Sequence, residues 1–388
     1  MKTICIYHHN CADGFGAAWV VRKALGAGVQ FHPGIYGEAP PDVAGKDVIL
    51  VDFSYKYDVL VELSYKARSV IILDHHKSAA EDLGRLWKFH AGVEHDTRQE
   101  DGTVLLGWRS AFMHAEMQNC PRIAACFDME RSGAMLAWDH FFPGQEAPQL
   151  LKHIQDRDLW RFQFEGTREI QANLFSYPYD FEVWDRLMNL PALKMIEDGV
   201  AIERKHHKDV AELVAKTKRR MTIGGYGVPV ANLPYTLTSD AGHLMAQDEP
   251  FAACYMDTTR NRYFSLRSTD AGLDVSEIAK LYGGGGHRNA AGFSVPFEHP
   301  LACNAPPLKC YQVGEQDLVA AYTPEQAIAI LCSFSGYASD DFTVEDVSAW
   351  TDAELDRPCF EEDGTTPADP WRKAFASCTY PQYLGGWE

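Results

Sequence analysis

Three short apolar runs near the start of the chain each end in acidic or imidazole side chains. The runs cover residues 3–7, 47–51 and 69–73. Continuous apolar runs of this length are typical of strands buried in a parallel sheet. Because the carboxyl ends of such strands face the ligand crevice of an open sheet, we expect the polar groups that follow them to meet at one edge: His9, Asp13, Asp52, Asp74, His75 and His76.

Helical patterns alternate with these runs. Residues 14–25, 57–65 and 132–142 carry the spacing of amphipathic helices. Alternation of strands and helices predicts a doubly wound α/β domain with a parallel sheet. Residues 90–126 break this alternation, and we interpret them as an insertion.

A long helical pattern over residues 193–220 follows, and we expect it to join the first domain to a second, smaller α/β domain. Its basic end, residues 216–220, is interpreted as a solvated helix terminus. Strands should return between residues 225 and 293, with a helix at 274–281. The remaining segment, 298–388, has one expected helix at 324–332 and no catalytic motif. It is a candidate to pack on the body, cover a sheet edge or form a homodimer.

Composition narrows the class of protein. A chain of 388 residues is long enough for two domains. Its net charge of -18 argues against binding along a nucleic-acid backbone, which needs a basic stripe. A small anionic substrate stays compatible with this charge, because metals and a few local basic groups can supply the attraction.

The cysteine pattern and the first residues of the chain indicate the cellular compartment of the protein. The ten cysteines include no Cys-x-x-Cys pair, and the first apolar run begins at residue 3, which leaves no room for a signal peptide. No apolar stretch is long enough to span a membrane. We therefore expect a cytoplasmic protein with free thiols and no membrane partner.

The residue types at the expected sheet edge indicate a metal site. Mixed carboxylates and imidazoles suit divalent manganese, iron, cobalt or zinc. Two close metals can clamp the attacking and leaving oxygens of a phosphoryl transfer. Asp52 and Asp74 are both candidates to bridge two such ions.

A glycine run at residues 283–286 adds a second candidate site. Such a run costs chain entropy, and it lets backbone amides approach an anion closely. His287 and Arg288 follow immediately and suit phosphate binding. A flexible linker after the expected helix is the structural alternative.

The ordered motifs resemble those of the DHH phosphoesterases, a family named for Asp-His-His. His9 and Asp13 match the first motif, His-x-x-x-Asp-x-Asp, but Phe15 stands at its second aspartate. The lone aspartate of the second motif matches Asp52, and the third motif is Asp74-His75-His76. For the fourth motif Asp156 is our choice and Asp158 is the alternative.

The resemblance extends to the domain that accompanies the catalytic domain in this family. It implies a substrate-binding strand with Arg267 and a glycine-rich motif that contributes Gly284, Gly285, Gly286, His287, Arg288 and Asn289. The implied organisation is a DHH domain at 1–190, a helical linker at 191–220, a DHH-associated domain at 221–297 and an extension at 298–388. In the family the second domain closes over the metal site.

The resemblance implies hydrolysis of phosphoester bonds in short oligonucleotides, dinucleotides or phosphorylated nucleotides. The implied metal ligands are His9, Asp13, Asp52, Asp74, His75 and Asp156, with Asp74 and His76 in catalysis. One or two Mn²⁺ ions are expected, and Mg²⁺, Co²⁺ and Zn²⁺ are alternatives. An exopolyphosphatase, a single-strand exonuclease and, because of Phe15, an impaired nucleotide-binding sensor stay open. His8 and Asn10 are candidates to replace the missing ligand.

Overall fold

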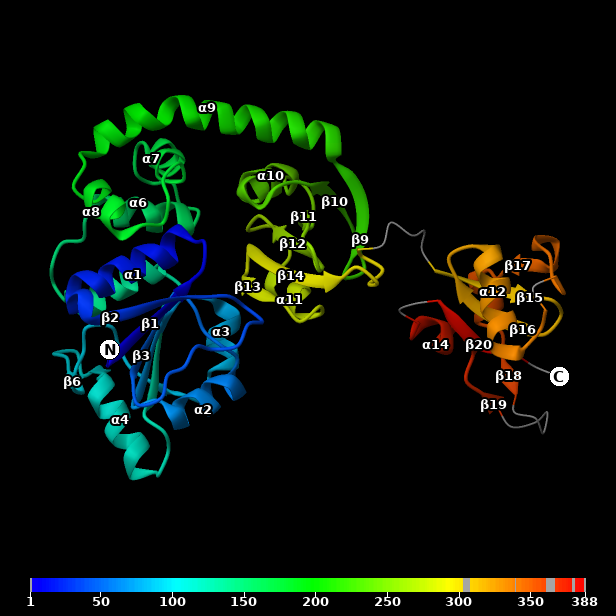
Figure 1. The fold of residues 1–388 in the computed structure, drawn as a ribbon, viewed down its shortest axis with the longest axis horizontal. Coiled ribbons are helices and arrows are strands. Elements are labelled where there is room, and N and C mark those ends of the chain that lie inside the picture. Colours follow the sequence, from blue (N-terminus) through cyan, green and yellow to red (C-terminus); the bar gives the residue numbers. More distant parts are fainter. Residues whose placement is uncertain (1, 303–307, 339, 361–366, 379–380, 387–388) are drawn as a thin grey trace. The chain divides into compact units, whose positions relative to one another are not determined.

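The computed structural model describes residues 2–302, 308–338, 340–360, 367–378 and 381–386 (Figure 1). The chain divides into two compact units. The first unit comprises Met1–Tyr255 and Phe264–Phe293, and the second comprises Met256–Tyr263 and Ser294–Glu388. In the described residues, no helix combines the length and apolar character needed to cross a membrane.

A six-stranded parallel sheet forms the core of the N-terminal part, which confirms the doubly wound α/β prediction. Its strand order is β2-β1-β3-β4-β8-β5. The order turns back between β1 and β3, so the crevice of this sheet lies where these strands end. The bounds are β1 Thr3–His8, β2 Val29–Gly34, β3 Asp47–Val51, β4 Ser69–Asp74, β5 Trp87–Lys88 and β8 Ile123–Phe127.

Helices cover both faces of this sheet because each strand buries apolar side chains on both sides. One hydrophobic cluster joins the sheet to α1 (Ala12–Leu25) and α5 (Gly133–Phe141), and a second joins it to α2 (Tyr57–Lys66). These helices confirm the predictions at 14–25, 57–65 and 132–142. A short helix, α3 (Lys77–Asp82), follows β4 directly.

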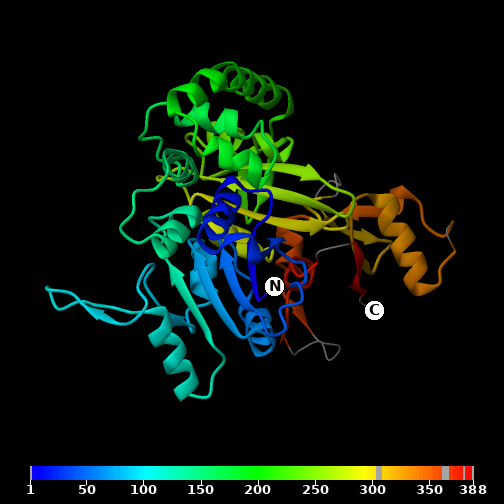
Figure 2. The ribbon, with the colours of Figure 1, turned by 60° about the vertical axis from the view of Figure 1, so that its left-hand side comes forward.

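The segment interpreted as an insertion, 90–126, is partly a component of the sheet. It contains a hairpin of β6 (Thr97–Arg98) and β7 (Val104–Leu105), which projects in cyan from the rest of the unit (Figure 2), and helix α4 (Trp108–Met117). Residues 123–126, however, belong to β8, which pairs with β4 and β5. Two alanines in this strand weaken its apolar signal, so the sequence pattern does not identify it.

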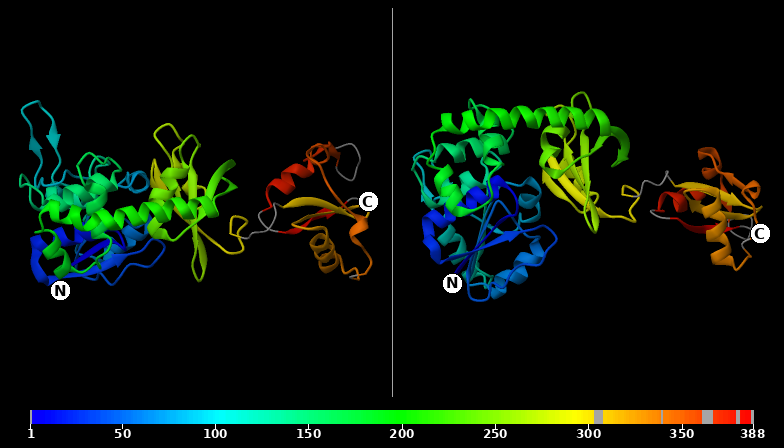
Figure 3. Two further views of the ribbon diagram at one scale, coloured as in Figure 1. Left: turned by 90° about the horizontal axis from the view of Figure 1, so that it is seen from above. Right: turned by 45° about the horizontal axis from the view of Figure 1, so that its top comes forward.

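Helix α9 (Ala192–Thr217) runs from the helices beside the first sheet to the second sheet (Figure 3). The prediction of a helix up to residue 220 is wrong at its end. Arg219 and Arg220 begin β9 (Arg219–Ile223), because a turn at Gly224 and Gly225, with φ of 58° and 86°, pairs this strand with β10. The helices beside the first sheet are α6 Gln149–Asp158, α7 Thr167–Leu174 and α8 Phe181–Leu187.

The second sheet has the order β13-β14-β12-β11-β10-β9. Its further strands are β10 Tyr226–Asn232, β11 Ala252–Asp257, β12 Asn261–Arg267, β13 Gly285–His287 and β14 Ala290–Pro296. Helix α10 spans Thr238–Met245, and α11 spans Val275–Lys280, which confirms the helix predicted before the glycine run.

The C-terminal unit contains a four-stranded sheet of order β17-β15-β16-β20 that packs on α12 (Pro324–Ser335). This helix confirms the one predicted at 324–332. The other bounds are β15 Lys309–Val313, β16 Asp317–Ala321, β17 Val347–Ala349, β18 Cys359–Phe360, β19 Pro367–Ala368, β20 Gln382–Gly386, α13 Asp352–Leu355 and α14 Trp371–Ala376.

Candidate metal centre

Asp52 and His75 lie at the centre of a buried polar cluster at the carboxyl edge of the parallel sheet. Each side chain is about 2% exposed. Asp52 Oδ1 lies 3.0 Å from His75 Nε2, and Asp52 Oδ2 lies 3.5 Å from His8 Nδ1. The two oxygens of one carboxylate therefore face two different imidazoles. Asp52 also has a left-handed backbone, with φ of 53°, and such strain in a non-glycine residue is concentrated at functional sites.

Asp13 and Asp158 complete one side of this cluster. His75 Nε2 lies 3.7 Å from Asp13 Oδ2 and 3.5 Å from Asp158 Oδ2. The Asp13 carboxylate accepts hydrogen bonds from the backbone N–H groups of Gly133 (2.5 Å) and Ala134 (3.1 Å), at the start of α5. A Cβ at residue 133 would lie 2.4 Å from Cβ of Asp52, so the close approach of α5 requires glycine.

The cluster contains buried polar atoms without partners. Within the described residues, His8 Nδ1, Asp52 Oδ2, His75 Nδ1 and Asp158 Oδ2 are buried and have no hydrogen-bond partner. Leaving such atoms unpaired costs about 1–3 kcal/mol each. Ligand atoms of Asp13, His75 and Asp158 form one group within 4.8 Å, and those of His8, Asp52 and His76 form another. This donor set fits divalent cations that accept both nitrogen and oxygen ligands.

The electrostatics of the cluster also fit a cation. Burial and the charges of Asp52 and Asp158 hold the pKa of Asp13 well above its usual range. Burial opposes protonation of His75, but its hydrogen bond with Asp52 and the charge of Asp158 raise its pKa to about 10. A divalent cation that binds here would compete with protons on these groups.

Asp74 contacts the cluster through the two histidines that follow it in the sequence. Its Oδ1 accepts the backbone N–H groups of His75 (2.8 Å) and His76 (3.2 Å) and lies 2.7 Å from His76 Nδ1. Its Oδ2 accepts a hydrogen bond from Ser54 Oγ at 2.6 Å. Both oxygens of Asp74 thus have protein partners, and this residue is not among the ligand atoms that lie within 4.8 Å of one another in the described residues.

The two aspartates near the end of α6 have different surroundings. Asp156, our choice from the sequence, accepts hydrogen bonds from Gln163 N (2.8 Å), Phe164 N (3.0 Å) and Thr167 Oγ1 (2.7 Å). Its carboxylate is thus used to hold a loop. Asp158, the alternative, lies in the cluster instead. Asp156 and Asp158 are two positions apart in the sequence, which separates their side chains by about 200° around the helix axis. Only one of the two can therefore face the sheet edge.

The first motif shows a similar displacement. His9 is exposed and lies outside the ligand groups, whereas the preceding His8, the last residue of β1, belongs to one of them. Phe15 is 2% exposed in the hydrophobic core, where its ring stacks on Phe181 at 4.7 Å. The position of the missing aspartate therefore faces the core of this chain and not the cluster.

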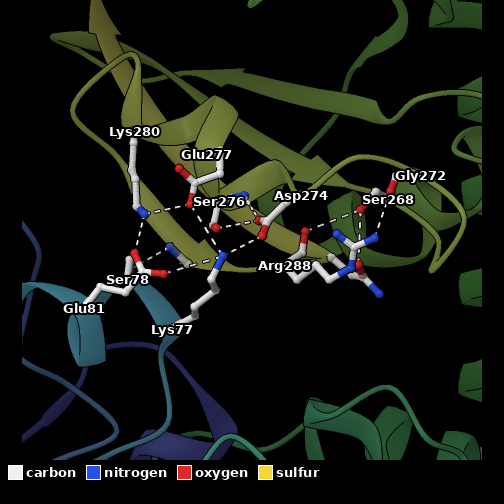
Figure 4. Close-up of polar contacts among 12 residues, drawn as sticks. Lys77, Ser78, Glu81, Ser268, Gly272, Asp274, Ser276, Glu277, Lys280 and Arg288 are labelled. Carbon is white, nitrogen blue, oxygen red and sulfur yellow. Dashed lines mark hydrogen bonds and ion pairs between the residues drawn. The ribbon is translucent and has the colours of Figure 1, made fainter.

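The glycine-rich motif brings His287 to the cluster. The His287 ring stacks on His76, with centroids 4.6 Å apart and an angle of 22°, and lies 4.6 Å from His75. Figure 4 shows how α3 contacts this motif: Gly286 N donates to Ser78 Oγ at 3.0 Å, and Lys77 Nζ donates to Asp274 at 2.6 Å. Lys280 pairs with Glu81 beside them.

The other residues predicted to bind substrate have mainly structural contacts. Arg288 donates to the carbonyl oxygens of Asp270 and Gly272, both at 3.1 Å (Figure 4). Asn289 Nδ2 donates to Asp270 Oδ1 at 2.6 Å. Both side chains hold the loop before α11. Gly285 lies against Ser78, where a Cβ would be 2.7 Å from its hydroxyl, and the preceding Gly284 lies against β14.

Two residues near the cluster, Ser54 and Tyr36, belong to none of the sequence motifs. Ser54 holds Asp74, and Tyr36 places its ring 5.4 Å from the ring of His8 and 6.4 Å from that of His76. Tyr36 is 53% exposed, so it lies at the mouth of the site. The sequence signal for Ser54 is only that it is a polar residue two positions after Asp52.

Comparisons with known proteins support a phosphoesterase. No family model matches the chain. It is 28% identical over 336 residues to uncharacterized protein R106 of Acanthamoeba polyphaga mimivirus, covering 77% of this chain and 70% of that protein. It is 23% identical over 311 residues to oligoribonuclease NrnB of Bacillus subtilis, covering 76% and 73%.

Among solved structures, the pGpG-specific phosphodiesterase PggH of Vibrio cholerae has a TM-score of 0.36 and 14% identity, over 76% of this chain and 94% of that one. An exopolyphosphatase-related protein of Bacteroides fragilis has a TM-score of 0.34 and 13% identity, over 75% and 86%. The sequence similarity to an oligoribonuclease, together with the ordered motifs, supports a phosphoesterase of the DHH type.

Proposed function

We propose that this chain is a metal-dependent phosphoesterase that hydrolyses short oligonucleotides, dinucleotides or small phosphorylated nucleotides. The observation that carries the proposal is the buried cluster around Asp52 and His75, whose unpartnered atoms converge at the crevice of a parallel sheet. The relative named as an oligoribonuclease supports this substrate class. The proposal also retains the expected cytoplasmic location, and the described cysteines are free.

The cluster offers two positions for divalent metals, with Mn²⁺ as the preferred ion. Asp13, His75 and Asp158 would hold one ion, and His8 and Asp52, whose ligand atoms group with His76, would hold the other. When bound, such ions lower the pKa of a water and polarise a phosphoryl group. Asp158 and His8 replace Asp156 and His9 in this assignment.

His76 is the residue that the proposal assigns to the leaving group. Asp74 Oδ1 holds its Nδ1 at 2.7 Å, which fixes the ring and directs Nε2 away from the carboxylate. From that position His76 would contact the phosphate or protonate the leaving oxygen. Burial and the charge of His76 lower the pKa of His287 to about 2, so this ring, stacked on His76, would contact the substrate as a neutral hydrogen-bonding group.

A nucleotide-binding sensor without activity, motivated by Phe15 and by the segment 298–388, stays an outcome of the test. The Phe15 side chain itself packs in the hydrophobic core. The net charge of -18 favours short substrates over long strands. Exopolyphosphatase activity stays an alternative, so polyphosphate is included among the substrates tested below.

Product release in the presence of Mn²⁺ tests the proposal. The substrates are a dinucleotide, 3′-phosphoadenosine 5′-phosphate, a cyclic dinucleotide, a longer single strand and polyphosphate. We expect turnover of the short nucleotides, its loss on chelation, and its loss in His75→Ala. His207→Ala, in an exposed histidine of α9, is the matched control. Absence of turnover on every substrate, with Mn²⁺ bound, would refute the proposal.

A further inference from the structure

Tyr36 presents an aromatic ring at the mouth of the metal centre. It lies two residues after β2, and the parallel pairing of β2 with β1 brings this loop beside His8 at the carboxyl edge of the sheet. The centroid of the Tyr36 ring lies 5.4 Å from that of His8 and 6.4 Å from that of His76. Because Tyr36 is 53% exposed, about half of its surface stays open to a ligand beside the metal centre.

The ring of Tyr36 is supported by aromatic residues of the core. Its centroid lies 4.8 Å from that of Phe53, with an angle of 35° between the two rings. Phe53 is fully buried, and the ring of Tyr55 packs edge-on against it at 4.9 Å. A Cβ at residue 34 would lie 2.7 Å from the Phe53 ring, so Gly34 at the end of β2 makes room for this ring. Tyr36 therefore rests on an ordered aromatic residue.

The backbone around Tyr36 forms a tight turn. Glu38 N donates to Ile35 O at 3.1 Å, and Gly37 has φ of 87°. A glycine with positive φ at the third position is typical of a type II turn, in which Tyr36 takes the second position. Two prolines at 40–41 restrict the rest of the loop. An aromatic side chain held in this way loses little conformational entropy when a ligand binds.

Tyr36 differs from the residues that the family resemblance assigns to the substrate. Arg267 of β12 donates to Leu266 O at 2.8 Å and to Ser239 Oγ at 2.9 Å, so its guanidinium has protein partners. Arg267 is a charged donor, whereas Tyr36 offers a planar and largely apolar surface. A ligand that suits Tyr36 combines an anionic group for the metal centre with a planar ring for the tyrosine.

We propose that Tyr36 stacks on a nucleobase next to the scissile phosphate and thereby makes the enzyme selective for nucleotides over polyphosphate. Every base has a π face, so such stacking tolerates any of the four bases. In a nucleotide the base is one sugar away from its phosphate, which suits a ring that lies beside His8 and His76 and outside the ligand groups. The inference rests on the proposed function and deepens it, because it names the second part of the substrate that is recognised.

Three dinucleotides test this contact: one with both bases, one without the 5′ base and one without the 3′ base. We expect the wild type to lose about tenfold or more in kcat/KM when one particular base is absent. Tyr36→Ala should show the same loss on the complete dinucleotide. On the dinucleotide that lacks the stacked base, Tyr36→Ala should stay within about twofold of the wild type, because the two changes remove the same contact. Tyr36→Phe retains the ring and should retain the preference for the base.

The outcomes separate stacking from a structural role of the ring. Equal kcat/KM of the wild type on all three dinucleotides overturns the proposal without any variant. An equal loss of Tyr36→Ala on all three would mean that the ring only supports Phe53 and the loop. Unchanged kcat/KM of Tyr36→Ala on the complete dinucleotide would mean that no base stacks there. Each of these results overturns the proposal, as does turnover of polyphosphate by the wild type as fast as that of the complete dinucleotide.

A matched variant controls for the loss of an exposed tyrosine. Tyr65→Ala, in a residue of α2 that is 73% exposed, should leave kcat/KM unchanged on every dinucleotide. Since Tyr36 is about half exposed as well, Tyr36→Ala should fold, and its Tm is compared with that of Tyr65→Ala. The comparison of the three dinucleotides in the wild type tests the proposal even where Tyr36→Ala is unstable.

Calorimetry separates this proposal from the proposed function. If the wild type hydrolyses none of the dinucleotides with Mn²⁺ present, the proposed function fails. Titration of the three dinucleotides into the wild type, Tyr36→Ala and Tyr36→Phe then still tests the stacking contact. Tighter binding of the complete dinucleotide, lost in Tyr36→Ala and kept in Tyr36→Phe, supports it, and equal binding of all three dinucleotides overturns it.

Discussion

The acidic cluster around Asp52 differs in charge and construction from the arginine cluster beside it, in which Arg168 lies 3.4 Å and Arg157 lies 4.0 Å from the carboxylate of Asp240. The first is assembled mainly from the ends of parallel strands, and its unpartnered atoms are carboxylate oxygens and imidazole nitrogens. The second is assembled from helices and one loop, and its unused groups are donors. Charges left unpaired in both clusters reduce the stability of the folded chain. The acidic cluster has an excess of carboxylates that a cation would balance, whereas the arginines face a carboxylate of the chain itself.

The largest effect is expected at the centre of the acidic cluster. Asp52→Asn removes the charge that lies between His75 and His8, so turnover should fall by about a thousandfold or more. Stabilisation by added Mn²⁺, measured as a shift in Tm, should be lost with it. Asp58→Asn, on the exposed surface of α2, should leave both unchanged. A variant at Asp52 that still gains Tm from Mn²⁺ would place the ion elsewhere.

Phe15 tests whether the acidic cluster lacks a member. Phe15→Asp restores the family motif but buries a carboxylate among Phe181, Trp184 and Tyr179. The free energy of unfolding should fall by about 4 kcal/mol or more, whereas Phe15→Leu should cost about 1–2 kcal/mol. Chemical denaturation measures both. A well-folded Phe15→Asp that binds an additional Mn²⁺ ion would show that this position reaches the metal centre after all.

The two aspartates of α6 separate the roles of the clusters. Asp158→Ala should weaken Mn²⁺ binding about a hundredfold with little change in stability, since its carboxylate lies among ligand atoms. Asp156→Ala removes the acceptor of three hydrogen bonds, so it should lower the free energy of unfolding by about 3 kcal/mol. Metal titration and denaturation of both variants check this. The reverse pattern would restore Asp156 as the ligand.

The sequence predicted the parts of the site that come from strand ends. Asp52 and His75 follow apolar runs, and the parallel sheet carries such residues to one edge whatever the details of the loops. The sequence does not decide whether His8 or His9, and Asp156 or Asp158, lies nearer the cluster, because this depends on where β1 ends and how α6 is rotated. A shift of one or two residues along β1 or α6 changes which side chain faces the cluster, and a sequence motif does not determine that shift.

The arginine cluster could not have been predicted in this way. Arg157, Arg168 and Asp240 come from three helices, and no short motif joins them. The same limit applies to β8, whose alanines give a weak apolar signal, and to the end of α9, where pairing with β10 overrides the helical pattern. Tertiary contacts decide these features, and local propensity does not.

The smallest effect is expected where the second domain holds His287 against the acidic cluster. Ser78 Oγ accepts one neutral hydrogen bond from Gly286 N at 3.0 Å, next to His287 (Figure 4). Since such a bond contributes about 1 kcal/mol, Ser78→Ala should reduce kcat about three- to fivefold. The neighbouring pairs Lys77–Asp274 and Lys280–Glu81 are partly exposed, so raised ionic strength should enlarge the deficit of the variant by screening them. Ser333→Ala, on the exposed part of α12, is the control. A Ser78→Ala enzyme with unchanged kcat at every salt concentration would mean that His287 is positioned by its stacking on His76 alone.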